Sequence, residues 1–351
     1  MALTLPPALA PAADSAVERP TLKTIAAATG LAVATVSRAL KDAPDIGEDT
    51  KRRVRETAAQ LGYRPNRAGV RLRTGKTNVI ALVLSAEADV MNHTSRLIYS
   101  IANGLRGTAY HLVVMPFFPD QDPMEPIRYI VETGSADGVI LNQTTPDDPR
   151  IRYLAERGIP FASHGRTEMD LVHSYYDYDN DAFSRLGVRA LHARGRRRLM
   201  LIAPPRSQNY GRHMALGFAD EAALCGLTFE ILDHVTSDSG SVVIEAAVRQ
   251  RFAAPLPPDG LLVGSTTAAM AGVAGAERHG YRIGTDFDVV AKEAIPFLRS
   301  FRHEMILGYE DVGAAGTFLA QAITALIDRA SPADWQYLDR PTTLDAEEGK
   351  T

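Results

Sequence analysis

From residue 78 to about residue 330, short apolar runs alternate with longer segments of helical periodicity. The apolar runs include "NVIALVLS", "DGVILN", "RRLMLIA" and "DGLLVG". Most of the helical segments between one apolar run and the next are 10 to 15 residues long. Strands that alternate with helices of this length are typical of parallel sheets built from strand–helix–strand units. The polar run "SYYDYDN" divides the alternation into two comparable halves, so we predict two α/β lobes over residues 78–335.

Two such lobes also predict where a ligand would bind. Ligands of open α/β sheets lie at the carboxyl ends of the strands. A cleft between two lobes is the default place for a small-molecule site. The sequence therefore indicates a cleft that strand ends from both lobes would line.

Residues 20–76, which precede the lobes, form a basic segment. They contain 12 Lys and Arg against five Asp and Glu, a balance of +7, whereas the whole chain carries −4 and the remainder therefore −11. A basic segment on an acidic body indicates a module that binds a polyanion, with a solvated charged face as the alternative.

The basic segment predicts three short helices. "TLKTIAAATG" indicates a first helix that Gly30 ends, a second begins near Val33, and "IGEDTKRRVRETAAQLGYRPN" indicates a third that Gly62 and Pro65 end. The predicted inner stripes are Leu22, Ile25, Ala26 and Thr29, then Val36, Ala39 and Leu40, then Val54, Ala58 and Leu61. Two helices joined by a tight turn with glycine form a helix-turn-helix, whose second helix can enter a major groove.

The second predicted helix carries small side chains and one arginine on the face opposite its inner stripe. Val33 and Ala34 can contact a thymine methyl group, and Arg38 can bind the O6 and N7 atoms of guanine. Phosphate oxygens are bound by side chains of the types found at Thr35, Ser37 and Lys41. This face is therefore predicted to contact DNA.

The stretch from Thr21 to Val83 closely resembles the DNA-binding region of the lactose-repressor/galactose-repressor (LacI/GalR) family of bacterial transcription regulators. The pieces "ATVSRAL", "LGYRPN" and "LRTGKTN" come in the family's order and spacing, and a weaker resemblance extends to about residue 330. The resemblance implies that Val33, Ala34 and Arg38 face bases and that Tyr63 and Asn66 help seat the module. The candidate DNA-binding residues are Thr24, Val33, Ala34, Thr35, Ser37, Arg38, Lys41, Tyr63, Asn66, Leu72 and Arg73.

Two local features qualify this resemblance. Ala32 stands where the family usually has a serine that caps the recognition helix, and losing such a cap costs about 1 kcal/mol. Residues 67–73 of the hinge make a poor helix by themselves, because the segment is short and carries Gly69. In the family this hinge folds only on operator DNA, where Leu72 would enter the minor groove while Arg71, Arg73 and Lys76 meet phosphates. The alternative is a flexible basic linker.

The resemblance further implies a sugar or related effector in the cleft. Mapped by position, the strand-end contacts would be Ser85, Asn142, Arg166 and Glu293. Met214 stands where the family has a sugar-contacting arginine, and Thr266 and Thr267 replace its Asn-Asp pair. Arg212 and His213, just upstream of Met214, are the candidates to replace the arginine. The candidate effector-binding residues are therefore Ser85, Asn142, Arg166, Arg212, His213, Thr266 and Glu293. The class of effector stays open at this point: it can be a monosaccharide, a disaccharide, a polyol or a sugar acid.

Motifs of other function classes are missing from the sequence. It has no G-x-x-x-x-G-K-[ST] loop, no G-x-G-x-x-G after a strand and no G-x-S-x-G elbow, and its nine histidines show no metal-ligand spacing. The alternating Asp177, Asp179 and Asp181 lack the rest of a calcium loop, so we interpret them as an edge strand and a helix cap. We therefore expect no cofactor, no metal and no enzymatic activity. The single cysteine, Cys225, excludes internal disulfides.

Together these features predict an α/β protein with an N-terminal three-helix helix-turn-helix DNA-binding domain, a hinge, and a two-lobed periplasmic-binding-protein-like effector domain. The predicted parts are a disordered leader (1–18), the DNA-binding domain (19–66), the hinge (67–77), the two-lobed effector and dimerisation domain (78–335) and a tail (336–351). We expect a cytoplasmic homodimer on a near-palindromic operator, with no membrane contact because no apolar run approaches about 18 residues. The alternatives are a sugar-binding protein of the periplasmic type and a sugar-processing enzyme with an accessory DNA-binding module.

Overall fold

The computed structural model describes residues 20–63, 75–85, 91–118, 120–294 and 296–345. The chain divides into two compact units, Met1–Thr77 and Asn78–Thr351, and each is described by itself. The predicted leader and three of the candidate DNA-binding residues, Asn66, Leu72 and Arg73, lie outside the described residues. Within the described part of the chain, no helix is long and apolar enough to cross a membrane.

The first unit consists of three helices around a small core. They are α1 (Leu22–Thr29), α2 (Val33–Ala39) and α3 (Glu48–Gln60). Its buried apolar residues are Ile25, Ala26, Val36, Ala39, Val54 and Ala58, all of which belong to the predicted stripes. Gly30 ends α1 with a φ of 68°, a left-handed conformation that glycine adopts without strain. Ala32 gives α2 no side-chain cap, as predicted.

The first lobe of the second unit is a six-stranded parallel sheet with helices on both faces. Its strands, in spatial order, are β11 (Gln336–Asp339), β5 (Ser174–Tyr178), β4 (Phe161–His164), β3 (Gly138–Leu141), β1 (Val79–Ser85) and β2 (His111–Phe117). One face packs against α5 (Met91–Gly104) and α13 (Val312–Ile327), the other against α6 (Glu125–Thr133) and α7 (Pro149–Glu156). A short 3-10 helix, η2 (Pro332–Asp334), precedes β11.

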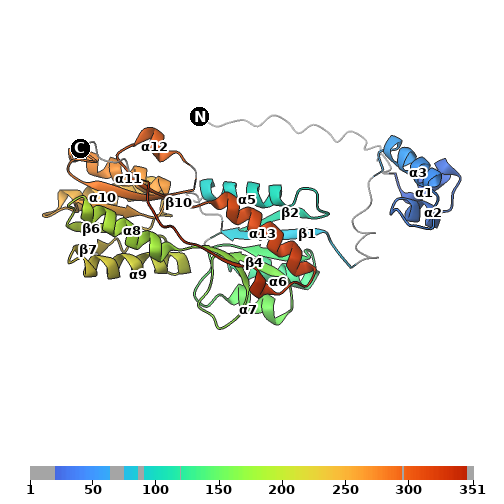
Figure 1. Cartoon of the computed structure of the whole chain (residues 1–351), viewed down its shortest axis with the longest axis horizontal. Helices are drawn as coiled ribbons and strands as arrows, with labels where there is room; N and C mark the ends of the chain where they lie inside the picture. The colour runs from blue at the N-terminus through green and yellow to red at the C-terminus, as the bar shows by residue number, and fades with distance from the viewer. Residues whose placement is uncertain (1–19, 64–74, 86–90, 119, 295, 346–351) are drawn as a thin grey trace, which may run out of the picture. The chain divides into compact units, whose positions relative to one another are not determined.

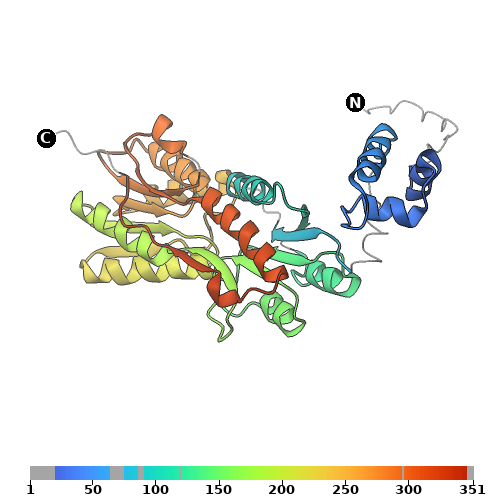
Figure 2. The ribbon, with the colours of Figure 1, turned by 45° about the vertical axis from the view of Figure 1, so that its right-hand side comes forward.

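Small residues let α5 and α13 pack closely, side by side on the sheet (Figures 1 and 2). A Cβ atom on Gly316 would lie 2.5 Å from the Cβ of Ser100, and one on Gly104 would lie 2.7 Å from the Cβ of Ala320. Neither position can therefore carry a side chain unless the helices separate.

The second lobe is a five-stranded parallel sheet of the same design. Its strands, in spatial order, are β10 (Ile306–Tyr309), β9 (Asp288–Glu293), β8 (Gly260–Val263), β6 (Arg198–Ile202) and β7 (Thr228–Ile231). Helices α8 (Asn180–Ala193) and α9 (Asn209–Leu224) cover one face, and α10 (Ser241–Ala253) and α11 (Thr266–Glu277) the other. The short α12 (Leu298–Phe301) follows β9. Two parallel-sheet lobes confirm the predicted α/β class.

The chain crosses between the lobes three times, and the outermost strand of the first sheet corrects one prediction. It crosses at Asp179, again after β10, and finally after β11, where Asp345 forms a bridge with Leu307 of β10. The segment "SYYDYDN" is not an edge strand, because β11 pairs with β5 on its outer side. Asp179 is the predicted helix cap, since its side chain accepts a hydrogen bond from the Ala182 N–H. Residues 336–345 contribute to both lobes, because β11 pairs with β5 and Asp345 forms a bridge with Leu307.

Candidate functional site

The outer face of α2 is exposed to solvent while its inner face is buried. Val33 is 40% exposed. Ala34 and Arg38 are also exposed, as is Lys41 just after the helix, whereas Thr35 and Ser37 are half-buried. Across the helix, Val36 and Ala39 are 0% exposed. The helix therefore presents small side chains and an arginine to whatever approaches its outer face.

Arg38 has a partner within its own unit. Its guanidinium pairs with Asp45, and both side chains are about half exposed. A base could therefore replace this carboxylate at the guanidinium. Thr24 is exposed and forms a reciprocal capping box with Thr21 at the start of α1. Tyr63 is half-buried against the three-helix core, so part of its role is structural.

The acidic residues before and at the start of α3 are neutralised within the unit. Asp42 lies 3.1 Å from Lys51 and 2.8 Å from Arg55, and these partners hold the pKa of Asp42 below its ordinary value. Glu48 pairs with Lys51, and Asp49 pairs with Arg52, each at 2.8 Å. Such pairing reduces repulsion between these carboxylates and a nearby polyanion.

In the second unit, a cavity of about 520 Å³ is lined by residues of both lobes. The first lobe contributes His93, Asn142, Gln143, His164, Gly165, Asp177 and Tyr178, and Glu310 lies on the connection after β10. The second lobe contributes Asn180, Pro204, Tyr210, Asp238, Ser241, Gly264, Ser265, Thr266, Thr267, Met270, Ala271, Lys292, Glu293, Ala294 and Phe297. Three of the predicted effector-binding residues, Asn142, Thr266 and Glu293, are therefore in its wall.

The other four predicted effector-binding residues lie outside the cavity lining. Ser85 is buried at the end of β1. Arg166 pairs with a residue of the wall, since its Nε lies 3.2 Å from the Oδ2 of Asp177. Arg212 and His213, proposed as substitutes for the family's arginine, both face Glu168, at 3.2 and 3.7 Å. Met214, at the arginine position itself, is buried in the core of the second lobe.

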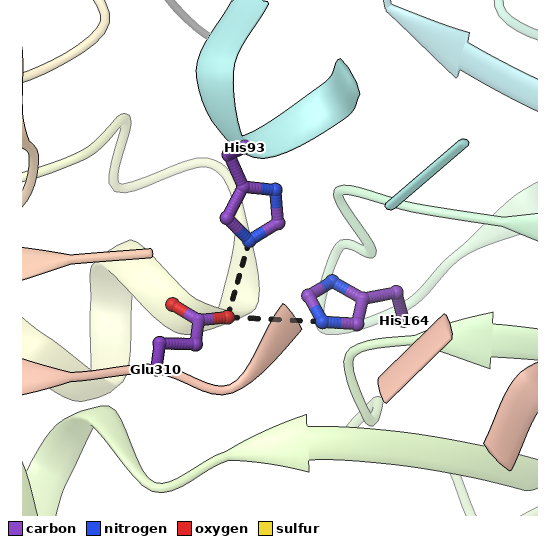
Figure 3. A group of neighbouring side chains, drawn as sticks. All are labelled: His93, His164 and Glu310. Atoms are coloured by element: carbon purple, nitrogen blue, oxygen red, sulfur yellow. Dashed lines mark hydrogen bonds and ion pairs between the residues drawn. The ribbon is translucent and has the colours of Figure 1, made fainter. Parts of the chain in front are cut away.

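A cluster of charged and polar side chains forms one side of the cavity. Glu310 is 2% exposed, and its Oε1 lies 3.2 Å from His93 Nε2 and 3.7 Å from His164 Nε2 (Figure 3). Its Oε2 lies 2.7 Å from Lys292 Nζ, which also donates to Asn180 Oδ1 at 3.0 Å. Burial alone would raise the pKa of Glu310, but Lys292 and His93 hold the pKa well below its ordinary value. Burial lowers the pKa of His164 to about 4, so its imidazole is neutral at pH 7.

Two more carboxylates face the cavity in different roles. Burial raises the pKa of Asp177 to about 7, against the opposing effect of Arg166. Glu293 Oε2 accepts hydrogen bonds from the backbone N–H groups of Phe297 and Leu298, at 3.2 and 3.1 Å. Glu293 thereby holds the start of α12, and with it Phe297, at the cavity.

Several buried polar atoms in the cavity wall have no hydrogen-bond partner among the residues that the structure describes. They are Asn142 Oδ1, Gln143 Nε2 and Oε1, His164 Nε2, and Tyr178 Oη. Buried polar groups are nearly always hydrogen-bonded in native proteins, so such a group marks a place for a polar ligand or water. Donors and acceptors together suit a ligand that carries hydroxyl groups.

Sequence reasoning missed most of the cluster. His164 ends β4, Lys292 lies in β9 and Glu310 follows β10, so applying the strand-end rule to every strand would have found His164 and Glu310. His93 lies on α5 and had no such signal. The expectation of no metal-ligand cluster was based on spacing along the sequence, and the structure brings together His93, His164 and Glu310 from distant positions.

Comparisons with known proteins agree with this architecture. Residues 21–66 match the family described as "Bacterial regulatory proteins, lacI family", and residues 188–302 match the periplasmic binding protein-like domain. The transcriptional regulator AglR of Rhizobium meliloti (strain 1021) is 31% identical over 311 residues, covering 86% of each chain. The transcriptional regulator RafR of Escherichia coli is 32% identical over 243 residues, covering 69% of this chain and 71% of RafR.

Two solved structures share the fold. A lac repressor dimer bound to operator and the anti-inducer ONPF has a TM-score of 0.81 at 19% identity, covering 93% of this chain and 98% of that one. A CelR–cellobiose complex has a TM-score of 0.65 at 23% identity, covering 95% and 100%. The sequence matches to relatives over most of their length, together with the helix-turn-helix match, establish that this chain belongs to the lacI family of bacterial regulatory proteins.

Proposed function

We propose that this protein is a transcription regulator that binds operator DNA through α2 and changes its operator affinity when a sugar-like molecule occupies the cavity. The observation that carries the DNA half is the exposed outer face of α2, where Val33, Ala34 and Arg38 stand opposite a buried inner face. Small apolar side chains and one arginine are suited to thymine methyl groups and a guanine edge.

The effector half is supported by the unpartnered polar atoms in a cavity that both lobes line. A ligand held by both lobes binds one lobe arrangement better than another, which is what an effector must do to change affinity elsewhere. The related CelR was solved with cellobiose, so glucose-containing disaccharides are sensible first candidates. We propose that the regulator is a repressor of transcription.

We further propose a homodimer on a near-palindromic operator. Strand β2 is at the edge of its sheet and exposes Val113 and Val114, at 41% and 38%. An exposed apolar edge strand favours association with a second surface. Two paired chains would place two copies of α2 on two half-sites. Because the proposed target is operator DNA, we infer a cytoplasmic location.

Operator selection tests this function directly. The full chain is incubated with randomised duplexes at fixed salt, with and without each member of a sugar panel, and bound sequences are read. We expect a near-palindromic site whose occupancy changes with one sugar, and Asn142→Ala should weaken that response without altering the selected site. Binding that falls with salt but selects no sequence would contradict the regulator assignment.

The hinge is tested separately, because its residues lie outside those that the structure describes. If Leu72 enters the minor groove, Leu72→Ala should reduce DNA bending with less effect on nonspecific affinity. Bending is measured by the electrophoretic mobility of circularly permuted operator fragments. Equal bending by both proteins would contradict the role of Leu72.

A further inference from the structure

We propose that His93, His164 and Glu310 bind one divalent transition-metal ion, and that this ion fastens the two lobes together. The three side chains come from three separate elements: α5, the end of β4, and the connection after β10 (Figure 3). Each offers one ligand atom, and these atoms lie within 4.8 Å of one another. Imidazole nitrogens with one carboxylate oxygen are the donor set of many three-ligand zinc sites.

The spacing of the ligand atoms fits a tetrahedral ion. Zinc bonds of about 2.0–2.1 Å place neighbouring ligand atoms about 3.3 Å apart. Glu310 Oε1 lies 3.2 Å from His93 Nε2 and 3.7 Å from His164 Nε2, so two sides of the triangle are already close to that length. The ligand nitrogens of the two histidines lie within 4.8 Å of each other, and rotation of the imidazole rings can close the third side.

The carboxylate of Glu310 is oriented for this role by a neighbour. Its Oε1 faces both imidazoles, while its Oε2 is held 2.7 Å from Lys292 Nζ. Lys292 is fixed in turn by Asn180 Oδ1 at 3.0 Å. An ion at Oε1 therefore leaves the lysine contact intact, and Lys292 acts as the outer-shell partner that metal-binding carboxylates usually have.

His164 provides an independent observation. Its side chain is 10% exposed, and its buried Nε2 has no hydrogen-bond partner among the described residues. A cluster held only by hydrogen bonds would pair this nitrogen, since Glu310 Oε1 is only 3.7 Å away. A metal ion bound between the two atoms gives this nitrogen its partner.

The charge of the cavity also favours a cation. Among the described residues, its wall contains the carboxylates of Asp177, Asp238, Glu293 and Glu310 and the single ammonium of Lys292. Arg166, which pairs with Asp177, offsets one more of these charges. A net negative excess remains, which lowers the energy of a divalent cation at this position.

The position of the site lets the ion act on the arrangement of the two lobes, and this effect rests on the proposed function. His93 and His164 belong to the first lobe, whereas Glu310 follows a strand of the second. An ion bound to all three links the lobes, and its fourth coordination position opens to the cavity, where an effector hydroxyl can bind. The ion is therefore a second input into the lobe arrangement that controls operator affinity.

The metal site is tested with the untagged full chain after treatment with a chelator. Co²⁺ is titrated first, because a tetrahedral Co²⁺ site absorbs visible light, and Zn²⁺ is then added to displace it. We expect one equivalent of Co²⁺ to bind. Loss of an outer-shell partner typically lowers metal affinity about 10–100-fold, so removal of a ligand in His93→Ala or His164→Ala should lower it at least as much. His303→Ala, at an exposed histidine 3.8 Å from Glu304, is the matched control and should bind as wild type does.

Each outcome decides a separate claim. The site would be overturned if the wild type shows no Co²⁺ absorbance, or if wild type, His93→Ala and His164→Ala bind Co²⁺ with the same affinity. Trp335 fluorescence shows whether the variants are folded. Operator affinity is then measured with and without Zn²⁺: a change in wild type that His93→Ala abolishes supports the link between lobes, and no change overturns it. Absence of any operator binding would contradict the proposed function while leaving the Co²⁺ titration valid.

Discussion

The buried ion pair of Asp148 and Arg150 fixes a loop of the cavity, so its removal should have a large and measurable cost. The two side chains are 0% and 4% exposed, and Arg150 Nη2 lies 2.7 Å from Asp148 Oδ2. Asp148 also accepts hydrogen bonds from the backbone N–H groups of Thr145 and Arg150, the second of which caps α7. The same guanidinium donates to the carbonyl oxygens of Asn142 and Gln143, which line the cavity.

We expect Asp148→Asn to lower the free energy of unfolding by about 3–5 kcal/mol, because it leaves the guanidinium buried without a counter-charge. The asparagine keeps an oxygen for the helix cap. Asp148→Ala loses that cap as well, which adds about 1 kcal/mol. Combining Asp148→Asn with Arg150→Met removes the buried charge and should recover most of the loss.

Urea unfolding followed by the fluorescence of Trp335 measures these changes. Trp335 is the chain's single tryptophan, and it packs against Phe318 in the same lobe as the ion pair. A loss below about 1 kcal/mol for Asp148→Asn, the value of a solvent-exposed pair, would refute the reasoning. A double variant no more stable than Asp148→Asn would refute it equally.

The pH dependence of the same measurement gives a second check. Burial alone would raise the pKa of Asp148, but Arg150 and the two backbone N–H groups hold the pKa below its ordinary value of 3.8. A carboxyl whose pKa is lowered by folding stabilises the fold above its ordinary pKa, and this contribution disappears as pH falls through the folded-state pKa. The difference between wild type and Asp148→Asn should be full at pH 7 and should shrink below about pH 3.8.

Three further predictions concern α2, the contact between α5 and α13, and the cavity wall. Arg38→Ala should cost about 1–3 kcal/mol in operator binding and relax the preference at one base pair. Lys41→Ala should weaken binding to all sequences alike. An unchanged selection profile for Arg38→Ala would contradict base reading. Gly316→Ala should lower the free energy of unfolding by about 1–3 kcal/mol, because its Cβ would lie 2.5 Å from that of Ser100, and urea unfolding would show this. Because the pKa of Asp177 is raised to about 7, its contribution to stability is present below its ordinary pKa of 3.8 and is lost as pH rises to about 7. Urea unfolding across that range should show a decline in wild type that Asp177→Asn lacks.

Local periodicity was enough to predict most elements of the fold. The inner stripe of α2 and its exposed outer face follow from side chains three and four positions apart, because a short helix must bury one face and expose the other. Alternating strands and helices likewise predicted both parallel sheets. The edge assignment of β5 failed because its outer neighbour, β11, lies more than 150 residues away in the sequence. Nothing local in "SYYDYDN" reveals that partner.

The candidate site was predicted less well than the fold, for the same physical reason. Of the four strand-end residues mapped from the family resemblance, Asn142 and Glu293 line the cavity, whereas Ser85 and Arg166 do not. The positions of Arg212 and His213 depended on which way one helical turn faces, and in the structure that turn faces Glu168. A position in the sequence fixes the element that a side chain is on, but its neighbours across the lobes depend on tertiary packing.

The three crossings between the lobes determine how an effector can act. The first and third are tied together, because the Asp179 N–H donates to the Asp339 carbonyl at 2.8 Å and Arg340 Nε donates to Asp179 Oδ2 at 2.9 Å. A single linker would let one lobe swivel freely about the other, but three parallel connections remove most of these degrees of freedom and leave a shared bend. Ligands of different size and chemistry therefore change the same bend between the lobes, and they differ in the bend angle that they stabilise.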